Sequence, residues 1–284
     1  MSDLRWGERT YLMGIINITP DSFSGDGIAL PGRSEAEVVA AALDQARGFV
    51  ESGADILDVG AESSRPAQFY GEHAALTAEA EVALAIPVVA ALARALGGRA
   101  LISIDTTKGE VARRALAAGA GMVNDVWAGR RDPGTIEAAA QAGAYLVLMH
   151  NKEVAEYPDG LFEEVAEWLR SAVSDAIAAG VPRDRLIVDP GIGFGKTPAH
   201  SIELLHRLGE LKAALGDLPL LVGTSRKRFI GELLGGAPPG TRLEGTLASV
   251  ALTIAGGADI VRVHDVAPSA RVVRVADGIV RWPV

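Results

Sequence analysis

The chain contains 284 residues, of which 49% are hydrophobic, and its 27 basic and 36 acidic residues give a formal charge of −9. This length and hydrophobic share allow a sizeable core and exclude a disordered chain. The absence of cysteine excludes a disulfide scaffold, a thiolate nucleophile and zinc-finger or iron–sulfur ligation. The acidic balance argues against a general nucleic-acid-binding protein, so an anionic substrate would need a local cluster of cations.

The start of the chain and its hydropathy pattern indicate a cellular location. Residues 1–8 include Asp3, Arg5 and Glu8 and lack the apolar core of a signal peptide. No uncharged run reaches the roughly 18 residues of a membrane span. We therefore expect a cytoplasmic protein without a membrane partner. Because no linker or low-complexity segment interrupts the chain, we expect one domain over residues 1–284.

Eight short apolar runs recur along the chain, each followed by a polar or glycine-rich turn. They cover residues 11–16, 56–59, 101–104, 122–123, 145–149, 186–188, 220–222 and 260–263. Their nearly continuous apolar character is typical of parallel strands that are covered on both faces.

Segments with helical periodicity lie between these runs. The first apolar stripe is Val39, Leu43, Ala46 and Val50, and its i, i+4, i+7, i+11 spacing places all four on one helix face. Three further stripes are Phe162-Val165-Leu169-Val173, Leu204-Leu208-Leu211-Leu215 and Leu247-Val250-Ala251-Ile254. Eight strand–helix units in this length predict an α/β fold, a single (β/α)8 TIM barrel. An open doubly wound sheet shares the same alternation and is the alternative.

Polar side chains follow almost every predicted strand, at the end of a barrel where active sites form. They are Asn17, Asp58, Asp105, Asn124, Asp125, His150, Asp189, Thr224 to Lys227, Arg262 and His264. A barrel without a site at this end would show a few such residues, so the pattern indicates an enzyme.

The stretch DPGIGFGKT, at residues 189–197, looks like two nucleotide-binding motifs and fits neither. A phosphate-binding loop requires four residues between its first glycine and the Gly-Lys pair, and here Gly191 and Gly195 are separated by three. A dinucleotide fingerprint requires a third glycine where Lys196 stands. Neither motif is therefore assigned to this stretch.

Eight sequence blocks, in order and at the predicted strand ends, carry a resemblance that covers nearly the whole chain. They are NITPDSF (17–23), DVGAESSRP (58–66), SIDT (103–106), NDV (124–126), Met149-His150, DPGIGFGK (189–196), GTSRK (223–227) and RVHD (262–265). Together they resemble the dihydropteroate synthases of the pterin-binding barrel family. The resemblance implies a transferase that joins 6-hydroxymethyl-7,8-dihydropterin diphosphate to p-aminobenzoate and releases pyrophosphate.

The resemblance assigns pterin binding to Asp105, Asn124, Asp189 and Lys227. The chemistry agrees, because a carboxylate accepts parallel N–H bonds from the pterin edge and an amide can both donate and accept. Capping of the next helix is the structural alternative for an aspartate at a strand end. Convergence of two carboxylates and one amide in a barrel mouth favours the ligand, since such acceptors are costly to bury without donors.

The resemblance assigns diphosphate binding to Asn17, Arg65, Arg262 and His264, with Asn17 also associated with Mg²⁺. Arginine has the fork geometry that phosphate prefers, and magnesium prefers hard oxygen ligands and substrate phosphates. Arg262 and His264 alternate with valines at a strand end, which favours side chains that face into the barrel.

The aminobenzoate site is assigned by the same resemblance to Phe23, Ser64, Pro66, Ser225 and Arg226. A serine at a helix N-terminus can bind a carboxylate together with backbone N–H groups, although it can also simply cap that helix.

The resemblance implies that C–O cleavage comes first and leaves a cation delocalised over the dihydropterin ring. Asp105 and Asp189 would stabilise that cation, while Arg262, His264, Arg65 and Mg²⁺ would stabilise the departing anion. The expected catalytic residues are Asp105, Asp189, Lys227, Arg262 and His264. An aromatic amine is neutral at pH 7, so no strong base and no covalent intermediate are expected.

Two alternatives stay open beside the synthase. One is a pterin-binding paralogue without synthase activity, because the loops after Phe23 and Pro66 depart from the family pattern. The other is a methyltetrahydrofolate–corrinoid methyltransferase, which would not need the blocks around Arg65, Ser225 and Arg262. The resemblance also suggests a homodimer through the later helices, with Leu247, Val250 and Ile254 as candidates that barrel packing explains equally well.

Overall fold

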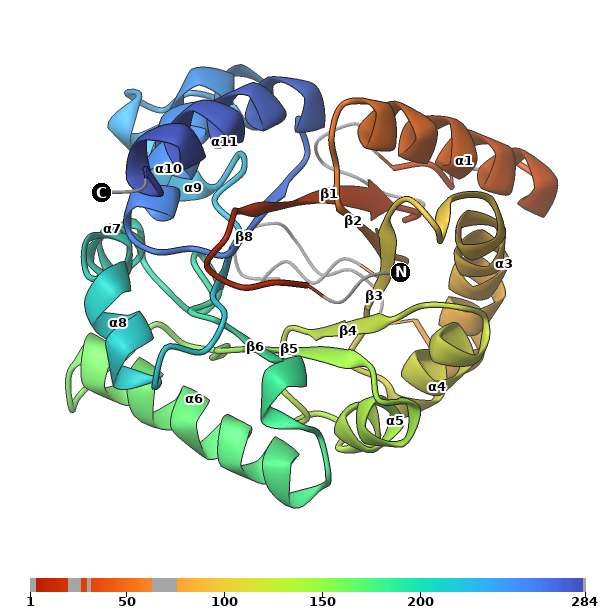
Figure 1. The fold of residues 1–284 in the computed structure, drawn as a ribbon, viewed down its shortest axis with the longest axis horizontal. Helices are drawn as coiled ribbons and strands as arrows, with labels where there is room; N and C mark the ends of the chain where they lie inside the picture. Colours follow the sequence, from red (N-terminus) through yellow and green to blue (C-terminus); the bar gives the residue numbers. More distant parts are fainter. Residues whose placement is uncertain (1–3, 20–26, 30–31, 63–75, 283–284) are drawn as a thin grey trace.

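The computed structural model describes residues 4–19, 27–29, 32–62 and 76–282. Its centre is a ring of eight strands (Figure 1). These are β1 (Tyr11–Asn17), β2 (Ile56–Gly60), β3 (Leu101–Asp105), β4 (Met122–Asp125), β5 (Tyr145–Met149), β6 (Leu186–Asp189), β7 (Leu221–Val222) and β8 (Ile260–Val263). Every predicted apolar run is therefore a strand.

All paired strands are parallel, in the order β6-β5-β4-β3-β2-β1-β8-β7. A parallel bridge between Val188 on β6 and Leu220, the residue before β7, joins the two ends of this order. The sheet therefore closes on itself, which confirms the predicted (β/α)8 barrel and excludes the open doubly wound sheet.

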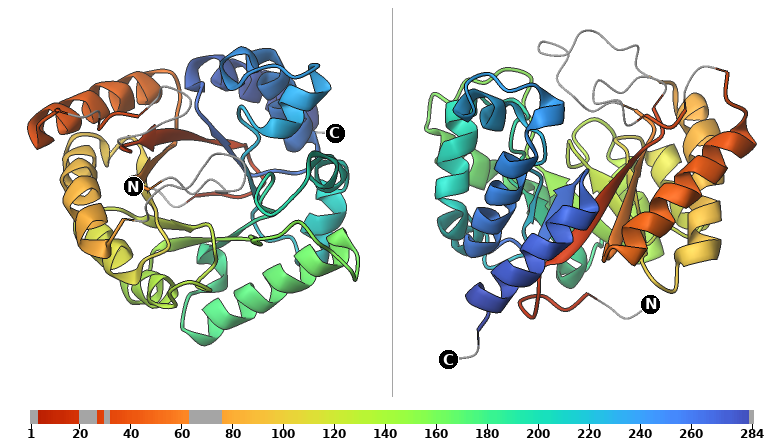
Figure 2. Two further views of the ribbon diagram at one scale, coloured as in Figure 1. Left: turned by 180° about the vertical axis from the view of Figure 1, so that it is seen from behind. Right: turned by 90° about the horizontal axis from the view of Figure 1, so that it is seen from above.

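Helices surround the strands on the outside, as the two further views show (Figure 2). Those in the described ranges are α1 (Glu35–Glu51), α3 (Ala78–Leu96), α4 (Gly109–Ala117), α5 (Gly134–Ala142), α6 (Leu161–Ala178), α7 (Pro198–His206), α8 (Leu208–Ala214), α9 (Arg228–Leu233), α10 (Leu243–Ala255) and α11 (Val266–Val280). None of the helices in this part of the chain is long and apolar enough to cross a membrane.

The predicted helical stripes agree with the structure in part. On α6 and α10 the stripe residues face the core, but on α1 the fully buried stripe is Val38, Ala42 and Ala46, with Val39 and Leu43 only half-buried beside it. The leucine stripe from 204 to 215 predicts one helix, and the structure has two. The backbone leaves helical geometry at Arg207 (φ −104°, ψ 20°), close to Gly209, a poor helix former.

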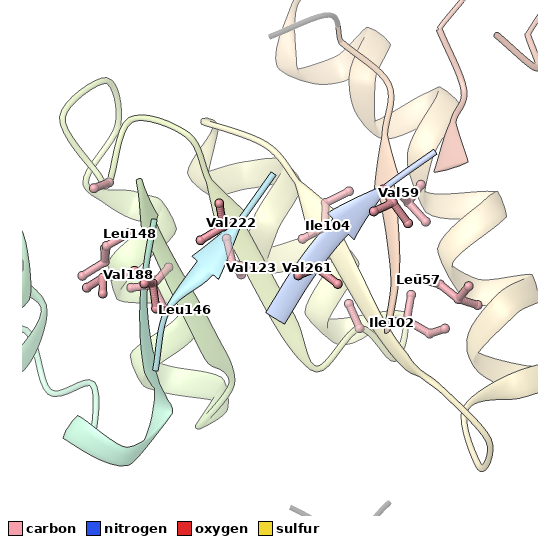
Figure 3. Close-up of a cluster of buried hydrophobic side chains, with 14 of the residues drawn as sticks. Leu57, Val59, Ile102, Ile104, Val123, Leu146, Leu148, Val188, Val222 and Val261 are labelled. Atoms are coloured by element: carbon pink, nitrogen blue, oxygen red, sulfur yellow. The ribbon is translucent and has the colours of Figure 1, made fainter. Parts of the chain in front are cut away.

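Alternate strand residues point outward and form the main hydrophobic core against the helices. Figure 3 shows ten of them: Leu57, Val59, Ile102, Ile104, Val123, Leu146, Leu148, Val188, Val222 and Val261. Because side chains alternate across a strand, the residues between these point into the barrel.

The inward-pointing residues near the amino ends of the strands form a second hydrophobic cluster. It comprises Tyr11, Met13, Ile56, Leu101, Met122, Tyr145, Val147, Ile187, Leu221 and Ile260. Trp6 covers it from below, with its ring edge-on to Tyr11 and Tyr145 at centroid distances of 5.7 and 6.1 Å. This cluster fills the amino-terminal end of the barrel, so among the described residues the opposite end is the one suited to a ligand.

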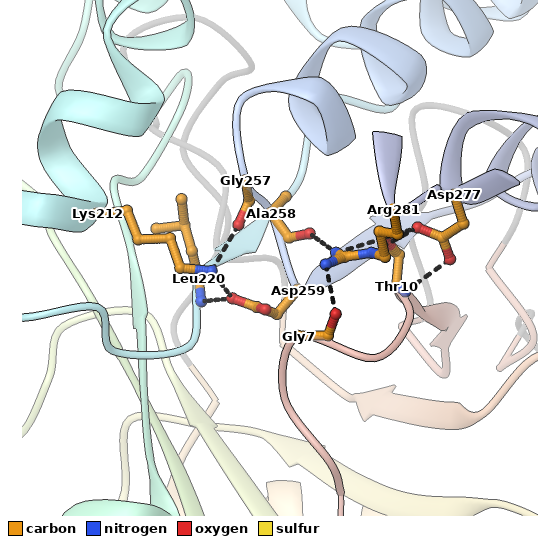
Figure 4. A network of polar contacts seen from close by, with 9 residues as sticks. All are labelled: Gly7, Thr10, Lys212, Leu220, Gly257, Ala258, Asp259, Asp277 and Arg281. Atoms are coloured by element: carbon orange, nitrogen blue, oxygen red, sulfur yellow. Dashed lines mark hydrogen bonds and ion pairs between the residues drawn. The ribbon is translucent and has the colours of Figure 1, made fainter. Parts of the chain in front are cut away.

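Polar contacts hold the end of the chain against the same bottom end of the barrel (Figure 4). Asp277 on α11 accepts hydrogen bonds from both the backbone and the hydroxyl of Thr10, each at 2.7 Å. Arg281 donates to the carbonyls of Gly7 and Ala258. These bonds join α11 to the residues preceding β1 and β8, and so close the ring where first and last strands meet.

Candidate active site

The residues that point into the barrel change from apolar to polar toward the carboxyl ends of the strands. Adjacent register positions carry Asn17 on β1, Gly60 on β2, Asp105 on β3 and Asn124 on β4. Asp189 ends β6, and Arg262 lies two positions after the inward-pointing Ile260 on β8. The strand period of two thus places most of the sequence-predicted polar residues in one barrel mouth.

A chain of hydrogen bonds links four strands at the floor of this mouth. The guanidinium of Arg262 donates to Asp58 Oδ2 and to Asp105 Oδ2, each at 2.7 Å. Asn124 Nδ2 donates to the same Asp58 oxygen at 2.9 Å. Because its NH₂ group is bound to Asp58, the carbonyl oxygen of the Asn124 amide is left as an acceptor.

Asp58 is the residue whose role the sequence did not reveal. The residue is fully buried (0% exposed), and its Oδ1 atom has no hydrogen-bond partner among the described residues. It holds Arg262, which is 204 positions away in sequence, and fixes the orientation of the Asn124 amide. The sequence feature that could have indicated this role is the position of Asp58 on β2, two residues after Ile56 and therefore on the inward face.

Burial and the guanidinium of Arg262 have opposite effects on the pKa of Asp105 at the floor of the mouth. Burial raises the pKa of Asp105 to about 7, opposed by Arg262 and reinforced by Asp58. Burial would lower the pKa of Arg262, but Asp58 and Asp105 outweigh it and raise that pKa. Two carboxyl groups thus share one cation, and burial brings the pKa of one of the two, Asp105, close to neutral pH.

Asp189 and Lys227 lie together on the other side of the mouth. Burial raises the pKa of Asp189, while Lys227 and the Gly191 backbone N–H, which donates to Oδ1 at 2.7 Å, oppose that rise. The Lys227 amine donates to the carbonyl of Ile192 and lies 4.6 Å from the centre of the Phe194 ring. A carboxylate acceptor and an amine donor are therefore fixed beside each other.

Ser225 and His264 contact each other directly across the ends of β7 and β8. The Ser225 hydroxyl accepts the backbone N–H of His264 at 3.2 Å and is 2.9 Å from His264 Nδ1. Its hydroxyl therefore orients the imidazole. No capping of α9 by this side chain is seen, since α9 begins after Lys227.

Arg226 is held by a carboxylate in a left-handed backbone conformation (φ +59°). Its guanidinium makes two hydrogen bonds to Asp265, at 2.7 and 3.0 Å. Its backbone N–H donates to Thr246 Oγ1, and its carbonyl accepts from Arg242. The GTSRK segment is thus rigidly supported by α10 and by the residue that follows His264.

Of the predicted site residues, nine lie in the described part of the chain: Asn17, Asp105, Asn124, Asp189, Ser225, Arg226, Lys227, Arg262 and His264. Six of them lie at or next to the carboxyl ends of strands, and Ser225, Arg226 and Lys227 lie in the loop between the end of β7 and α9. Phe23, Ser64, Arg65 and Pro66 lie outside the described residues.

Asn17, the predicted magnesium ligand, offers one hard oxygen at the rim of the mouth. It is half-buried and ends β1, and its backbone carbonyl accepts a hydrogen bond from the backbone N–H of Ile28. Within the described ranges, no group of three His, Asp or Glu side chains could hold an ion. A single amide oxygen fits an ion held mainly by substrate phosphates and water, and does not fit a dedicated protein cage.

The mouth as a whole presents fixed acceptors at depth and cations beside them. Buried carboxylate and amide oxygens suit a flat heterocycle rich in N–H groups, because each oxygen can accept a further hydrogen bond from it. Arginine, lysine and histidine at the same end suit an anionic group attached to that heterocycle.

Comparison with known proteins agrees with this chemistry. The profile of the family described as pterin binding enzyme matches residues 13–264. The dihydropteroate synthase of Synechocystis sp. is 44% identical over 283 residues, covering 97% of this chain and 92% of that protein. The Bacillus subtilis dihydropteroate synthase is 40% identical, covering 98% and 91%.

Solved structures of dihydropteroate synthases are also similar to this chain, in both sequence and fold. A Clostridium difficile dihydropteroate synthase crystallised in the presence of pteroic acid has a TM-score of 0.89 and 40% identity, covering 98% of this chain and all of that one. A Xanthomonas albilineans dihydropteroate synthase in complex with 7,8-dihydropteroate has a TM-score of 0.83 and 39% identity, covering 97% and 95%. The chain therefore belongs to the pterin-binding enzyme family.

Proposed function

We propose that this protein catalyses the dihydropteroate synthase reaction. It condenses 6-hydroxymethyl-7,8-dihydropterin diphosphate with p-aminobenzoate to give 7,8-dihydropteroate and pyrophosphate. The observation that carries the proposal is the convergence of Asp105, Asn124 and Asp189 with Arg262 and Lys227 in one barrel mouth. The similarity to dihydropteroate synthases over nearly the full chain supports the same reaction.

The pterin ring would lie on the floor of the mouth. The oxygens of Asp105, Asn124 and Asp189 would accept its amino and ring N–H groups, and Lys227 would donate to its carbonyl and ring nitrogen acceptors. Asp58 supports this arrangement because its bond to Nδ2 leaves the Asn124 carbonyl oxygen for the ligand. The same carboxylates stabilise positive charge as it develops on the ring.

The diphosphate would lie toward the cations at the strand ends. Two Arg262 nitrogens bond to the floor carboxylates, which leaves further N–H groups of the guanidinium for an anion. His264, oriented by Ser225, and Asn17 complete the described part of this subsite. Mg²⁺, held by Asn17 and the substrate, would neutralise the diphosphate oxygens.

The chemistry is a substitution at the exocyclic carbon of the pterin. The C–O bond breaks and its electron pair leaves with pyrophosphate, so the exocyclic carbon becomes electron-poor and its positive charge is delocalised into the pterin ring. The amine nitrogen of p-aminobenzoate then forms the C–N bond and loses one proton. The protein contributes by holding the two charges in place, and such electrostatic stabilisation often accounts for most of an enzyme's rate enhancement.

The aminobenzoate would bind beside Ser225 and Arg226. The Arg226 guanidinium is held by its two hydrogen bonds to Asp265, so it is already in position before a carboxylate ligand binds. The Ser225 hydroxyl is occupied by His264, so this serine would connect the aminobenzoate and diphosphate subsites.

A pyrophosphate-release assay with both substrates, with and without Mg²⁺, tests the proposal. We expect release that requires both substrates and the metal ion. We expect Lys227→Ala to abolish turnover while the far-ultraviolet circular dichroism spectrum stays unchanged. Tight pterin binding with no release would instead favour the paralogue without synthase activity, and wild-type rates in Lys227→Ala would refute the assignment of that lysine.

A homodimer is proposed through α10 and α11. Leu252 on α10 and Val275 and Ile279 on α11 are 72%, 63% and 73% exposed, and the two helices pack against each other. Such an apolar surface suits a second copy of the chain. Val250 and Ile254, two of the residues that the sequence suggests for this contact, are instead buried in the barrel. Sedimentation of the wild type and of Leu252→Lys tests the dimer; a wild-type monomer refutes it.

Cytoplasmic location and a single domain remain predictions from the sequence.

A further inference from the structure

The glycine-rich stretch after β6 is not explained by the roles assigned above. Its residues 190–195 connect Asp189 to Lys196, and they pack against the segment that follows β5. A Cβ atom at Gly191 would overlap the carbonyl oxygen of His150, and one at Gly195 would overlap that of Lys152. Both glycines have positive φ, at +68° and +54°. The glycines therefore permit close packing of two loops.

Lys196 ends this stretch, and its side chain turns back underneath it. The residue is only 3% exposed, and its amine lies 2.8 Å from His150 Nδ1 and donates to the Phe194 carbonyl at 3.1 Å. A lysine amine has at least two N–H groups in either protonation state, so it can satisfy both partners. An amine buried without these acceptors would be costly.

His150 forms the other half of this buried pair. Burial lowers its pKa to about 2, with Lys196 contributing in the same direction, so the ring is neutral. Its ring packs edge-on against Trp168 at a centroid distance of 5.1 Å, and its backbone N–H donates to the Asp189 carbonyl. The Lys196 amine is thereby anchored to β5, β6 and α6.

Lys227 contacts the same loop. The Lys227 amine bonds to the Ile192 carbonyl and lies over the Phe194 ring, while Lys196 holds the Phe194 carbonyl. Both lysine side chains therefore contact the same short loop, residues 192–194. A displacement of Phe194 or Ile192 would move the Lys227 amine away from Asp189.

We infer that Lys196, anchored by His150, is a positioning residue that sets the place of the Lys227 amine through the Ile192–Phe194 loop. Lys196 itself would touch no substrate. The inference rests on the proposed pterin site, because it concerns the affinity that Lys227 contributes there. Its consequence is energetic coupling: Lys196 also interacts electrostatically with Asp189, so the part of its effect on pterin binding that disappears when Lys227 is removed measures its action through the loop.

A double-mutant cycle measured by calorimetry with 6-hydroxymethylpterin, without diphosphate or metal, tests this coupling. We expect Lys196→Met to raise the Kd about tenfold in the wild-type background and less than about twofold in a Lys227→Ala background. Equal fold-changes in the two backgrounds, or no change in either, would overturn the inference. If the wild type itself does not bind 6-hydroxymethylpterin, the proposed function fails instead.

Variants of His150 give an independent arm if Lys196→Met does not fold. His150→Asn retains an acceptor near the Nδ1 position and should preserve the Kd, whereas His150→Leu removes it and should raise the Kd as Lys196→Met does. Equal affinities for the two variants would contradict the anchor. Lys152→Met is the matched control, because the Lys152 amine bonds to the Glu164 carboxylate and the Glu156 carbonyl, whereas the atoms of Lys152 that pack on Gly195 are its backbone and Cβ, which the substitution keeps. Its Kd should equal that of the wild type.

Discussion

The raised pKa of Asp105 makes a quantitative prediction about stability. In the unfolded chain this carboxyl group titrates near 3.8, and in the folded protein burial raises its pKa to about 7. Below the unfolded pKa both states are protonated, and no difference arises. Between the two values the folded state binds the additional proton, so stability falls as the pH rises. Above about pH 7 the loss is complete.

The substitution Asp105→Asn removes this titration and keeps an oxygen that can accept from Arg262. At about 1.36 kcal/mol per pH unit, the difference between the two pKa values corresponds to at most about 4 kcal/mol. We therefore expect the variant to gain stability relative to the wild type by up to that amount between pH 4 and pH 8.

Urea denaturation of both proteins across that pH range measures the effect, and pyrophosphate release measures its functional counterpart. We expect the variant to be more stable at pH 8 and at least about 100-fold less active, because it lacks the charge that stabilises the cationic ring. A stability difference that does not change with pH would refute the reasoning about Asp105, and unchanged activity would refute its catalytic assignment.

Three further substitutions test other parts of the structure. Asp58→Ala leaves Arg262 with one carboxylate in place of two, and should cost about 3–5 kcal/mol in urea denaturation; a loss below about 1 kcal/mol would show that Asp58 does not hold the floor together. Gly191→Ala forces a Cβ against the His150 carbonyl at positive φ, so pterin affinity should fall at least about tenfold by calorimetry, and retained affinity would contradict the close loop packing. Trp6→Ala removes the side chain that covers the bottom of the barrel, and should lower the free energy of unfolding by about 1–3 kcal/mol while leaving the pterin Kd unchanged. A raised Kd would contradict the conclusion that the apolar bottom and the ligand-binding mouth of the barrel are independent of each other.

Local patterns in the sequence were sufficient to predict the barrel and much of its mouth. A short apolar run bounded by turns predicts a buried strand wherever it lies, and all eight such runs are strands. Asp105, Asn124 and Asp189 each lie at the end of a strand, so their position followed from the run itself. The alternation of Arg262 with its neighbouring valines likewise indicated its inward direction, which its bonds to Asp58 and Asp105 confirm.

Helix geometry was less well determined by the same patterns. A helical stripe is broad, so Val39, Leu43 and Val50 lie at the edge of the buried face of α1, and Ala46 is the one residue of that predicted stripe that is fully buried. The continuous leucine periodicity from 204 to 215 hid the break at Arg207, because all four leucines remain buried on both sides of it.

The sequence by itself determined which residues stand at the carboxyl ends of the strands, because strand period and strand ends are local properties of the chain. Only the tertiary structure decided which of them touch: Asp58 with Arg262, Ser225 with His264, and Lys196 with His150. These partners are 39 to 204 positions apart, and the closure of the barrel brings them together. Burial there removes the water that would otherwise satisfy each polar group, so each must find its partner in the protein or in the ligand.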